Sequence, residues 1–220
     1  MDSFGGWIET PQLLALAAAL GWASGVRLYA AVFLTGLAGF MGWIDLPQGL
    51  RILEHPGVMA ASGFMCFVEF FADKIPLIDS LWDTVHTLIR IPAGAGLAAA
   101  ALGADGQAMA WVAALLGGSL AATSHAAKMT TRAAVNTSPE PFTNVAVSLV
   151  EDGFVVFMLW LSATHPVIFA IALLLTLVLA VVLMVVLIRF LRVVARRLGD
   201  FFAGRPLAPR KLDVQENTHR

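Results

Sequence analysis

Acidic and imidazole side chains crowd into one short stretch of an apolar chain, VEFFADKIPLIDSLWDTVH at residues 68–86. They are Glu69, Asp73, Asp79, Asp83 and His86. The first two are four residues apart and share one face of a helix. The other three are spaced four and three apart, with Arg90 four further on, so they share a face of the next helix. The short turn at residues 74–78 brings the two faces together, and we expect the carboxylates to converge.

Such a convergence suits either metal binding or proton transfer. Carboxylate oxygens with one imidazole are typical ligands of Mg²⁺, Mn²⁺ or Fe²⁺, so a divalent metal ion is a candidate cofactor. Its candidate ligands are Glu69, Asp79, Asp83 and His86. Clustered carboxylates and histidines in a medium of low dielectric constant also favour a proton relay. The sequence has no ligand string such as HExxH, and a histidine beside Asp83 and Arg90 is also typical of an interior residue held by hydrogen bonds.

A second polar segment, between residues 123 and 152, repeats the arrangement with both signs of charge. Its first helix carries a basic face and its second an acidic one, joined by the turn NTSPEPF at residues 136–142. The side chains involved are His125, Lys128, Arg132, Asn136, Asn144, Ser148, Glu151 and Asp152. The basic face suits an anion, so a membrane enzyme acting on a lipid or anionic headgroup is an alternative. No GxSxG, P-loop or dinucleotide fingerprint indicates a reaction.

The amino-acid composition indicates whether water or a membrane surrounds these charges. Hydrophobic residues make up 59% of the 220, and 13% are charged, against about 25% charged in soluble domains. Residues 167–188 contain no charge and are long enough to cross the hydrocarbon core, which is about 30 Å thick. The single Cys66 excludes a disulfide within one chain, and the formal net charge of −1 gives no indication of nucleic-acid binding. The chain is therefore predicted to be an integral membrane protein.

Apolar runs between turn signals predict an all-α, polytopic protein of about six transmembrane helices with two polar helical hairpins. The predicted helices are residues 11–40, 57–73, 79–103, 108–135, 142–164 and 166–196. Gly21 and Gly25 interrupt the first just before Arg27, so we expect a broken or re-entrant helix there. Pro92 predicts a kink in the third. Small residues at 93–101 and 117–122 predict close packing, and such surfaces also join protomers into homo-oligomers.

Lysine and arginine predict the orientation. Basic residues follow the last span, which places the C-terminus in the cytoplasm. An even number of crossings then places the N-terminus there too. We expect residues 1–200 to form one transmembrane domain, and residues 201–220 to be a disordered basic tail with affinity for anionic lipid headgroups.

Four segments of the chain resemble a known family. They are ASGVRLYAAVFLTGLAG, VEFFADKIPLIDSLWDTVHTLIRIPAGA, SHAAKMTTRAAVNTSPEPFTN and SLVEDGF, in order over residues 15–165. They are similar to the bacterial inner-membrane family catalogued as domain of unknown function 4126. The resemblance implies a multi-helix protein of the bacterial inner membrane and supplies no activity.

The cost of the charges leads to a functional hypothesis. A charged group at the centre of a membrane helix costs about 2.5–3.5 kcal/mol, so these groups must face the bundle interior, a water-filled vestibule or one another. We expect a transporter or channel-like protein whose hairpins and Arg27 line a cytoplasm-facing cavity for an ion, a proton or a small charged solute. Asp73, Lys74 and Glu140 are expected to be solvated. A structural or interaction protein is the remaining alternative. Direct pairing of the hairpins would favour it, and an open polar pocket would favour ion handling.

Overall fold

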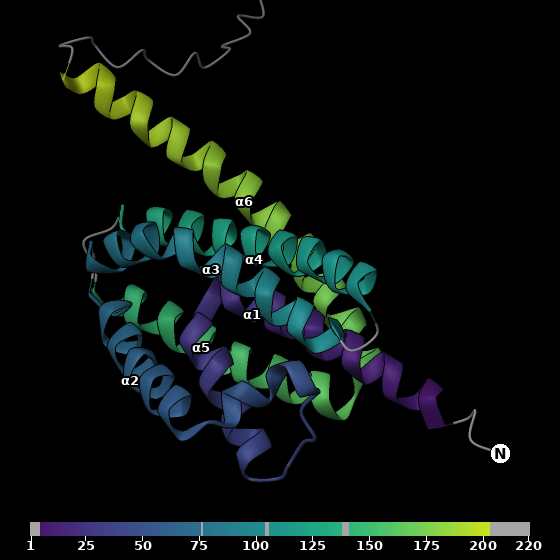
Figure 1. The fold of residues 1–220 in the computed structure, drawn as a ribbon. Coiled ribbons are helices and arrows are strands. Elements are labelled where there is room, and N and C mark those ends of the chain that lie inside the picture. Colours follow the sequence, from purple (N-terminus) through teal and green to yellow (C-terminus); the bar gives the residue numbers. More distant parts are fainter. Residues whose placement is uncertain (1–4, 76, 104–105, 138–140, 203–220) are drawn as a thin grey trace, which may run out of the picture.

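The computed structural model describes residues 5–75, 77–103, 106–137 and 141–202, and in this part of the chain it is entirely helical. Six α-helices and one 3₁₀-helix follow one another (Figure 1). They are α1 (Gly5–Phe40), η1 (Gln48–Glu54), α2 (Pro56–Ala72), α3 (Ile78–Leu102), α4 (Gln107–Val135), α5 (Pro141–Thr164) and α6 (Pro166–Phe202). The all-α prediction is confirmed, and the last five helices begin within a residue of the predicted positions. The tail after residue 202 and Glu140 lie outside the described residues.

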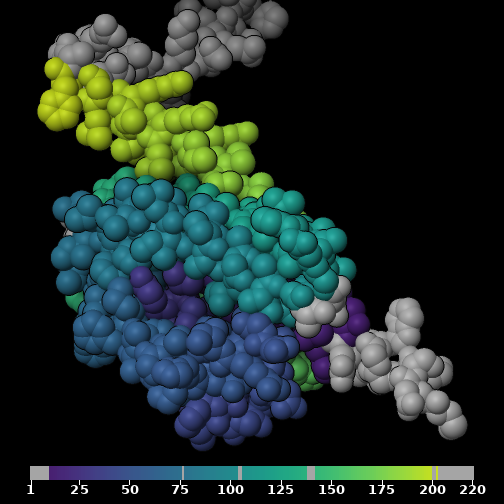
Figure 2. Space-filling model, viewed as in Figure 1, coloured from purple at the N-terminus to yellow at the C-terminus, as the bar shows by residue number. Residues whose placement is uncertain are grey.

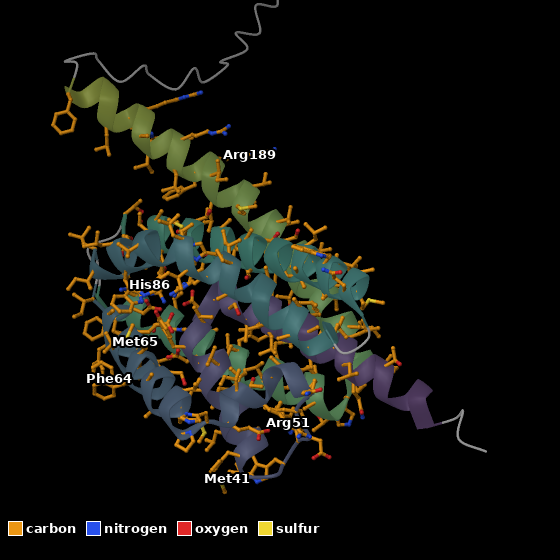
Figure 3. The ribbon with its side chains drawn as sticks, in the orientation of Figure 1. Met41, Arg51, Phe64, Met65, His86 and Arg189 are labelled. Carbon is orange, nitrogen blue, oxygen red and sulfur yellow. The ribbon has the colours of Figure 1, made fainter. Side chains whose placement is uncertain are left out.

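Four of the described helices are long and apolar enough to cross a membrane: Thr10–Phe40, Ile78–Leu102, Phe142–Thr164 and Pro166–Gly199. α2 is a shorter apolar helix. Large apolar side chains such as Phe64, Leu88 and Leu115 are more than half exposed, which is typical of helices that face lipid rather than water. α6 leaves the bundle, and Arg189 lies on its projecting part (Figures 1 and 3). These features support a membrane protein.

α1 is interrupted at Arg27, whose backbone has φ −145° and ψ 75°. The predicted break lay at Gly21–Gly25, and the departure from helical geometry comes two residues after Gly25. Gln12 near the start of α1 and Trp43 just beyond its end line one cavity, together with Ala101 of α3 and Ala163 of α5. Both ends of α1 therefore lie at the same end of the bundle, and the chain turns back on itself at Arg27 (Figure 1).

Small residues bring α1, α3 and α4 close together. A Cβ added to Gly21 of α1 would lie 2.7 Å from the Cα of Gly117 in α4, and one added to Gly117 would lie 2.7 Å from the carbonyl oxygen of Gly94 in α3. No side chain fits at such distances, so the three backbones pack directly. The predicted close packing of the small-residue runs is confirmed.

The two hairpin turns meet at the opposite end of the bundle from Gln12 and Trp43. Asn136, at the end of α4, donates hydrogen bonds to Asp79 at the start of α3. Arg132 of α4 donates to the carbonyl oxygen of Asp73, in the turn after α2. By contrast, α2 and α3 contact each other little, and Figure 2 shows atoms of α1 (purple) in the opening between them.

The direct packing of α4 on α3 predicts that Gly117→Ala destabilises the protein. The added methyl group has no space, and overpacking a well-packed interior costs about 1–3 kcal/mol. Thermal unfolding in a mild detergent should show a lower Tm. Gly96→Ala in α3 is the matched control, because no atom lies within 4 Å of a Cβ at that position. Equal melting temperatures for the two variants would contradict the packing described.

Candidate functional site

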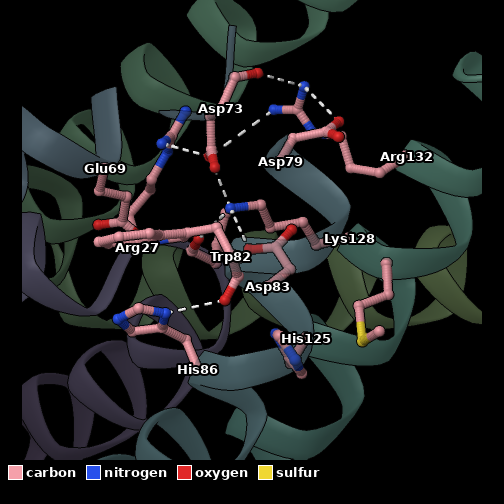
Figure 4. A network of polar contacts seen from close by, with 12 residues as sticks. Arg27, Glu69, Asp73, Asp79, Trp82, Asp83, His86, His125, Lys128 and Arg132 are labelled. Carbon is pink, nitrogen blue, oxygen red and sulfur yellow. Dashed lines mark hydrogen bonds and ion pairs between the residues drawn. The ribbon is translucent and has the colours of Figure 1, made fainter. Parts of the chain in front are cut away.

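Eight fully buried charged side chains, four basic and four acidic, gather where the two hairpins meet α1 (Figure 4). Among the described residues they are Arg27, Arg90, Lys128 and Arg132 with Glu69, Asp73, Asp79 and Asp83, each at most 4% exposed. We call them the charge cluster. They come from α1, α2 with its following turn, α3 and α4. The carboxylates of the first hairpin lie close together as expected, and the basic side chains of α1, α3 and α4 lie among them.

The break in α1 lies at the centre of this cluster. The carbonyl oxygen of Val26 accepts hydrogen bonds from Lys128 Nζ at 3.1 Å and Arg90 Nη1 at 3.3 Å. The carbonyl oxygen of Gly25 accepts from His125 Nδ1 at 3.2 Å and from Arg90 Nη1 at 3.4 Å. The last carbonyls of a helical segment lack partners within the helix and carry partial negative charge. Side chains of α3 and α4 thus cap the end of the first half of α1.

Lys128 is surrounded by oxygen atoms. Besides the Val26 carbonyl, its ammonium group lies 2.7 Å from Asp73 Oδ2 and 3.1 Å from Asp83 Oδ1. One oxygen comes from the broken helix, one from the turn after α2 and one from α3. Lys128 shares these oxygens with two arginines, because Arg90 also contacts Val26 O and Asp83 Oδ1, and Arg27 also contacts Asp73 Oδ2.

The arginines complete the pairing on either side of Lys128. Arg90 lies 2.5 Å from Glu69 Oε1 and 2.9 Å from Asp83 Oδ1. Arg27 pairs with Asp73 and, at 2.9 Å, with Asp152 of α5. It also donates to the hydroxyl of Ser148 at 2.9 Å. These contacts join α1, α2, α3 and α5.

Arg132 ties the end of the cluster to α5. It donates to Asn144 Oδ1 at 2.6 Å and lies 2.7 Å from Glu151 Oε2. It also donates to the carbonyl oxygen of Asp73 at 3.0 Å. Glu151 and Asp152 are partly exposed, at 15% and 26% of their side chains, so the network opens to its surroundings on the α5 side.

The two histidines lie beside the cluster rather than among its carboxylates. His86 Nδ1 donates to the carbonyl oxygen of Trp82 at 2.8 Å, and its Nε2 accepts from the Tyr29 hydroxyl at 3.1 Å. Its ring stacks on Trp82. His125 Nε2 lies 2.7 Å from the hydroxyl of Thr87. His86 is therefore an interior histidine held by hydrogen bonds.

The structure does not assemble the predicted metal ligands around one point. No group of three or more His, Cys, Asp or Glu side chains in the described part of the chain is placed to hold a metal ion. Glu69 and Asp83 pair with Arg90, Asp79 accepts from Asn136, and His86 contacts Tyr29. Each of the four predicted ligands thus has a protein partner, and the four do not face a common point.

Two side chains in the turn after α2, Asp73 and Lys74, are more buried than the sequence predicted. Asp73 was expected to be solvated and is wholly buried, because the basic face of α4 covers it. Burial raises its pKa, but the charges of Lys128 and Arg27 outweigh that effect and hold the pKa below its usual range. Lys74 is half-buried: it donates to the carbonyl oxygen of Phe70 and pairs with Asp152 at 3.6 Å, and burial lowers its pKa despite that carboxylate.

Sequence reasoning missed the backbone and one side chain of the site. No pattern in the sequence predicts the role of the Gly25 and Val26 carbonyl groups, except that glycines precede the break. Tyr29, the single tyrosine of the chain, lies two residues after Arg27. It falls within ASGVRLYAAVFLTGLAG, one of the four segments that resemble the family. None of the four cavities described here is lined by a member of the charge cluster.

Comparison with known proteins defines the class. A family model described as a domain of unknown function (DUF4126) matches residues 14–186. The chain belongs to this family, as its four segments indicated. No curated protein matches the chain, and no solved structure matches it.

The pairing predicts that Arg90→Met is strongly destabilising. Removing one partner of a buried pair leaves uncompensated charge and costs about 3–5 kcal/mol, and both Glu69 and Asp83 would lose their arginine. Adding Glu69→Gln should recover part of the loss, because one buried carboxylate is then neutral. Unfolding in detergent measures both effects. Arg51→Met, at an exposed arginine, is the control and should change stability by less than about 0.5 kcal/mol. An Arg90→Met protein as stable as this control would contradict the pairing.

Proposed function

We propose that the protein is a membrane transport protein that exchanges a cation or proton at the position held by Lys128. The observation that carries this proposal is the set of oxygens around its ammonium group, Val26 O, Asp73 Oδ2 and Asp83 Oδ1, at 2.7–3.1 Å. Carbonyls at the end of a broken membrane helix, together with buried carboxylates, are the groups that coordinate ions in many secondary transporters. On this proposal the ammonium group occupies the position that a transported cation would take.

Exchange at this position is balanced in charge. When Lys128 gives up its proton and its neutral amine moves aside, one monovalent cation takes its place among the same oxygens. One proton leaves the site for each cation that enters, so the cluster keeps four positive and four negative charges. The partly exposed Glu151 and Asp152 supply the route to the surroundings on the α5 side.

We propose that α2 to α6 each cross the bacterial inner membrane and that α1 is re-entrant. The basic residues of α6 put its end in the cytoplasm by the positive-inside rule, and the two hairpin turns lie on that side. The described start of α1 then lies on the outer side, beside Ala101 and Ala163. The proposed orientation differs from the expectation that both termini are cytoplasmic, which counted α1 as a full crossing.

A structural role is the second candidate, and it is favoured by the direct pairing of the two hairpins, the outcome expected of a structural protein. The fully buried charges are equal in number and pair directly, as a scaffold of ion pairs would require. The enzyme alternative receives no such support. Its anion-binding residues were His125, Lys128 and Arg132, and the two cationic side chains among them are paired with carboxylates.

Transport predicts that cation-dependent proton movement across proteoliposomes requires Asp83. Addition of Na⁺, K⁺ or another small cation outside should change the internal pH with the wild-type protein. Asp83→Asn and Glu69→Gln should slow this change at least about tenfold, a loss of about 1.4 kcal/mol. Asp83 would hold the cation directly, and Glu69 pairs with Arg90, which shares Asp83 Oδ1 and the Val26 carbonyl oxygen with Lys128. Unchanged flux in both variants would reject the proposal.

The orientation predicts where single cysteines react. In a Cys66→Ser background, Gln12→Cys and Gln48→Cys should react with a membrane-impermeant thiol reagent added outside spheroplasts. Thr137→Cys, in the turn after α4, should react only after lysis. Protection of Gln12→Cys from the external reagent would place the start of α1 in the cytoplasm and overturn the re-entrant arrangement.

A further inference from the structure

A groove opens sideways between α2 and α3, with α1 as its floor. Its volume is about 640 Å³, within the range of about 300–1,000 Å³ that is usual for ligand sites. Figure 2 shows the opening, where α1 is seen between the two helices. Val32 lies on the floor, and Ala61 and Gly96 lie on the two walls. The groove does not depend on the proposed exchange at Lys128.

The walls of the groove are apolar along its length. Ser62 also lines the groove, but its hydroxyl donates to the carbonyl oxygen of Val58 at 2.7 Å. Its proton is therefore used within α2 and not by an occupant of the groove. A Cβ on Gly96 would meet no atom within 4 Å, which makes that wall open rather than packed. The occupant that such walls recognise is a hydrocarbon chain.

The two ends of the groove are polar. Tyr29 closes the inner end, where its hydroxyl donates to His86. Beyond it, Glu69 lies one helical turn past Met65, and Arg90 lies one turn before Ala93. His55 lies at the other end, at the start of α2. An occupant therefore needs an apolar body that stops at Tyr29 and a polar group near His55.

The surroundings of the groove indicate which molecule occupies it. Phe64 and Phe67 of α2 and Leu88 of α3 are 62–82% exposed on its flanks, and α3 is one of the candidate spans. The groove therefore opens toward the hydrocarbon of the bilayer. Atoms lining an unfilled apolar space lose dispersion contacts on one side, and the neighbouring molecules able to restore them are phospholipids.

We propose that the groove binds one acyl chain of a bilayer phospholipid, with the headgroup at the His55 end. The chain lies between α2 and α3 against Val32 and ends at Tyr29. It holds apart two helices that the short turn after α2 would otherwise let close.

Native mass spectrometry of protein extracted in a mild detergent tests this site. The wild type should retain one phospholipid, and Gly96→Phe, which fills the groove, should reduce the retained fraction at least about tenfold. Gly153→Phe in α5 is the matched control, because a Cβ there also meets no atom within 4 Å and Gly153 does not line the groove. Delipidated wild-type protein should regain one lipid from phosphatidylethanolamine vesicles.

Each outcome decides the proposal. Retention by Gly96→Phe equal to that of the wild type, or equal loss in Gly153→Phe, would overturn it, as would a bound fatty acid or peptide mass in place of a phospholipid. If Gly96→Phe does not fold, Ala61→Phe on the facing wall replaces it with the same expected loss. Failure of the flux experiment leaves these expectations unchanged, because they concern the other side of Tyr29.

Discussion

A helix that ends inside a membrane protein must find donors for its last carbonyls, and the structure depends on how this chain meets that requirement. α1 stops being helical at Arg27, in the middle of the bundle. No water in the hydrocarbon is available to the carbonyls before the break. Lys128 and Arg90 supply the donors from two other helices, so the break is possible only where α3 and α4 pack against it.

The charge cluster follows from those donors. Two cations that cap buried carbonyls cannot remain uncompensated, since an isolated buried charge costs several kcal/mol. Asp83 forms ion pairs with both Arg90 and Lys128, Glu69 pairs with Arg90, and Asp73 pairs with Lys128. The carboxylates that pair with these two cations therefore come from α2, from the turn after it and from α3, where these segments lie beside Arg90 and Lys128. Such an ion-pair network can hold a fold together, and the proposed exchange of one of its cations would use the same contacts.

The bundle separates two kinds of interior. On one side of Tyr29 lie paired charges, and on the other lies the apolar groove between α2 and α3. The single tyrosine suits this boundary, because its ring packs against apolar groups while its hydroxyl bonds to His86. The divergence of α2 from α3 places the groove there, whereas direct backbone packing at Gly21, Gly94 and Gly117 leaves no comparable space between α1, α3 and α4.

The sequence by itself determined the helices, their polar faces and the family, because each depends on residues close together in the chain. The i, i+3 and i, i+4 spacing predicted that Asp79, Asp83 and Arg90 share a face, and the glycines before Arg27 predicted an interruption. Only the tertiary structure decided that Lys128 reaches Asp73 rather than solvent, that His86 turns to Tyr29, and that α1 returns to the end where it began. These depend on the rotation of each helix against its neighbours and on backbone carbonyls, and no periodicity within one segment carries that information.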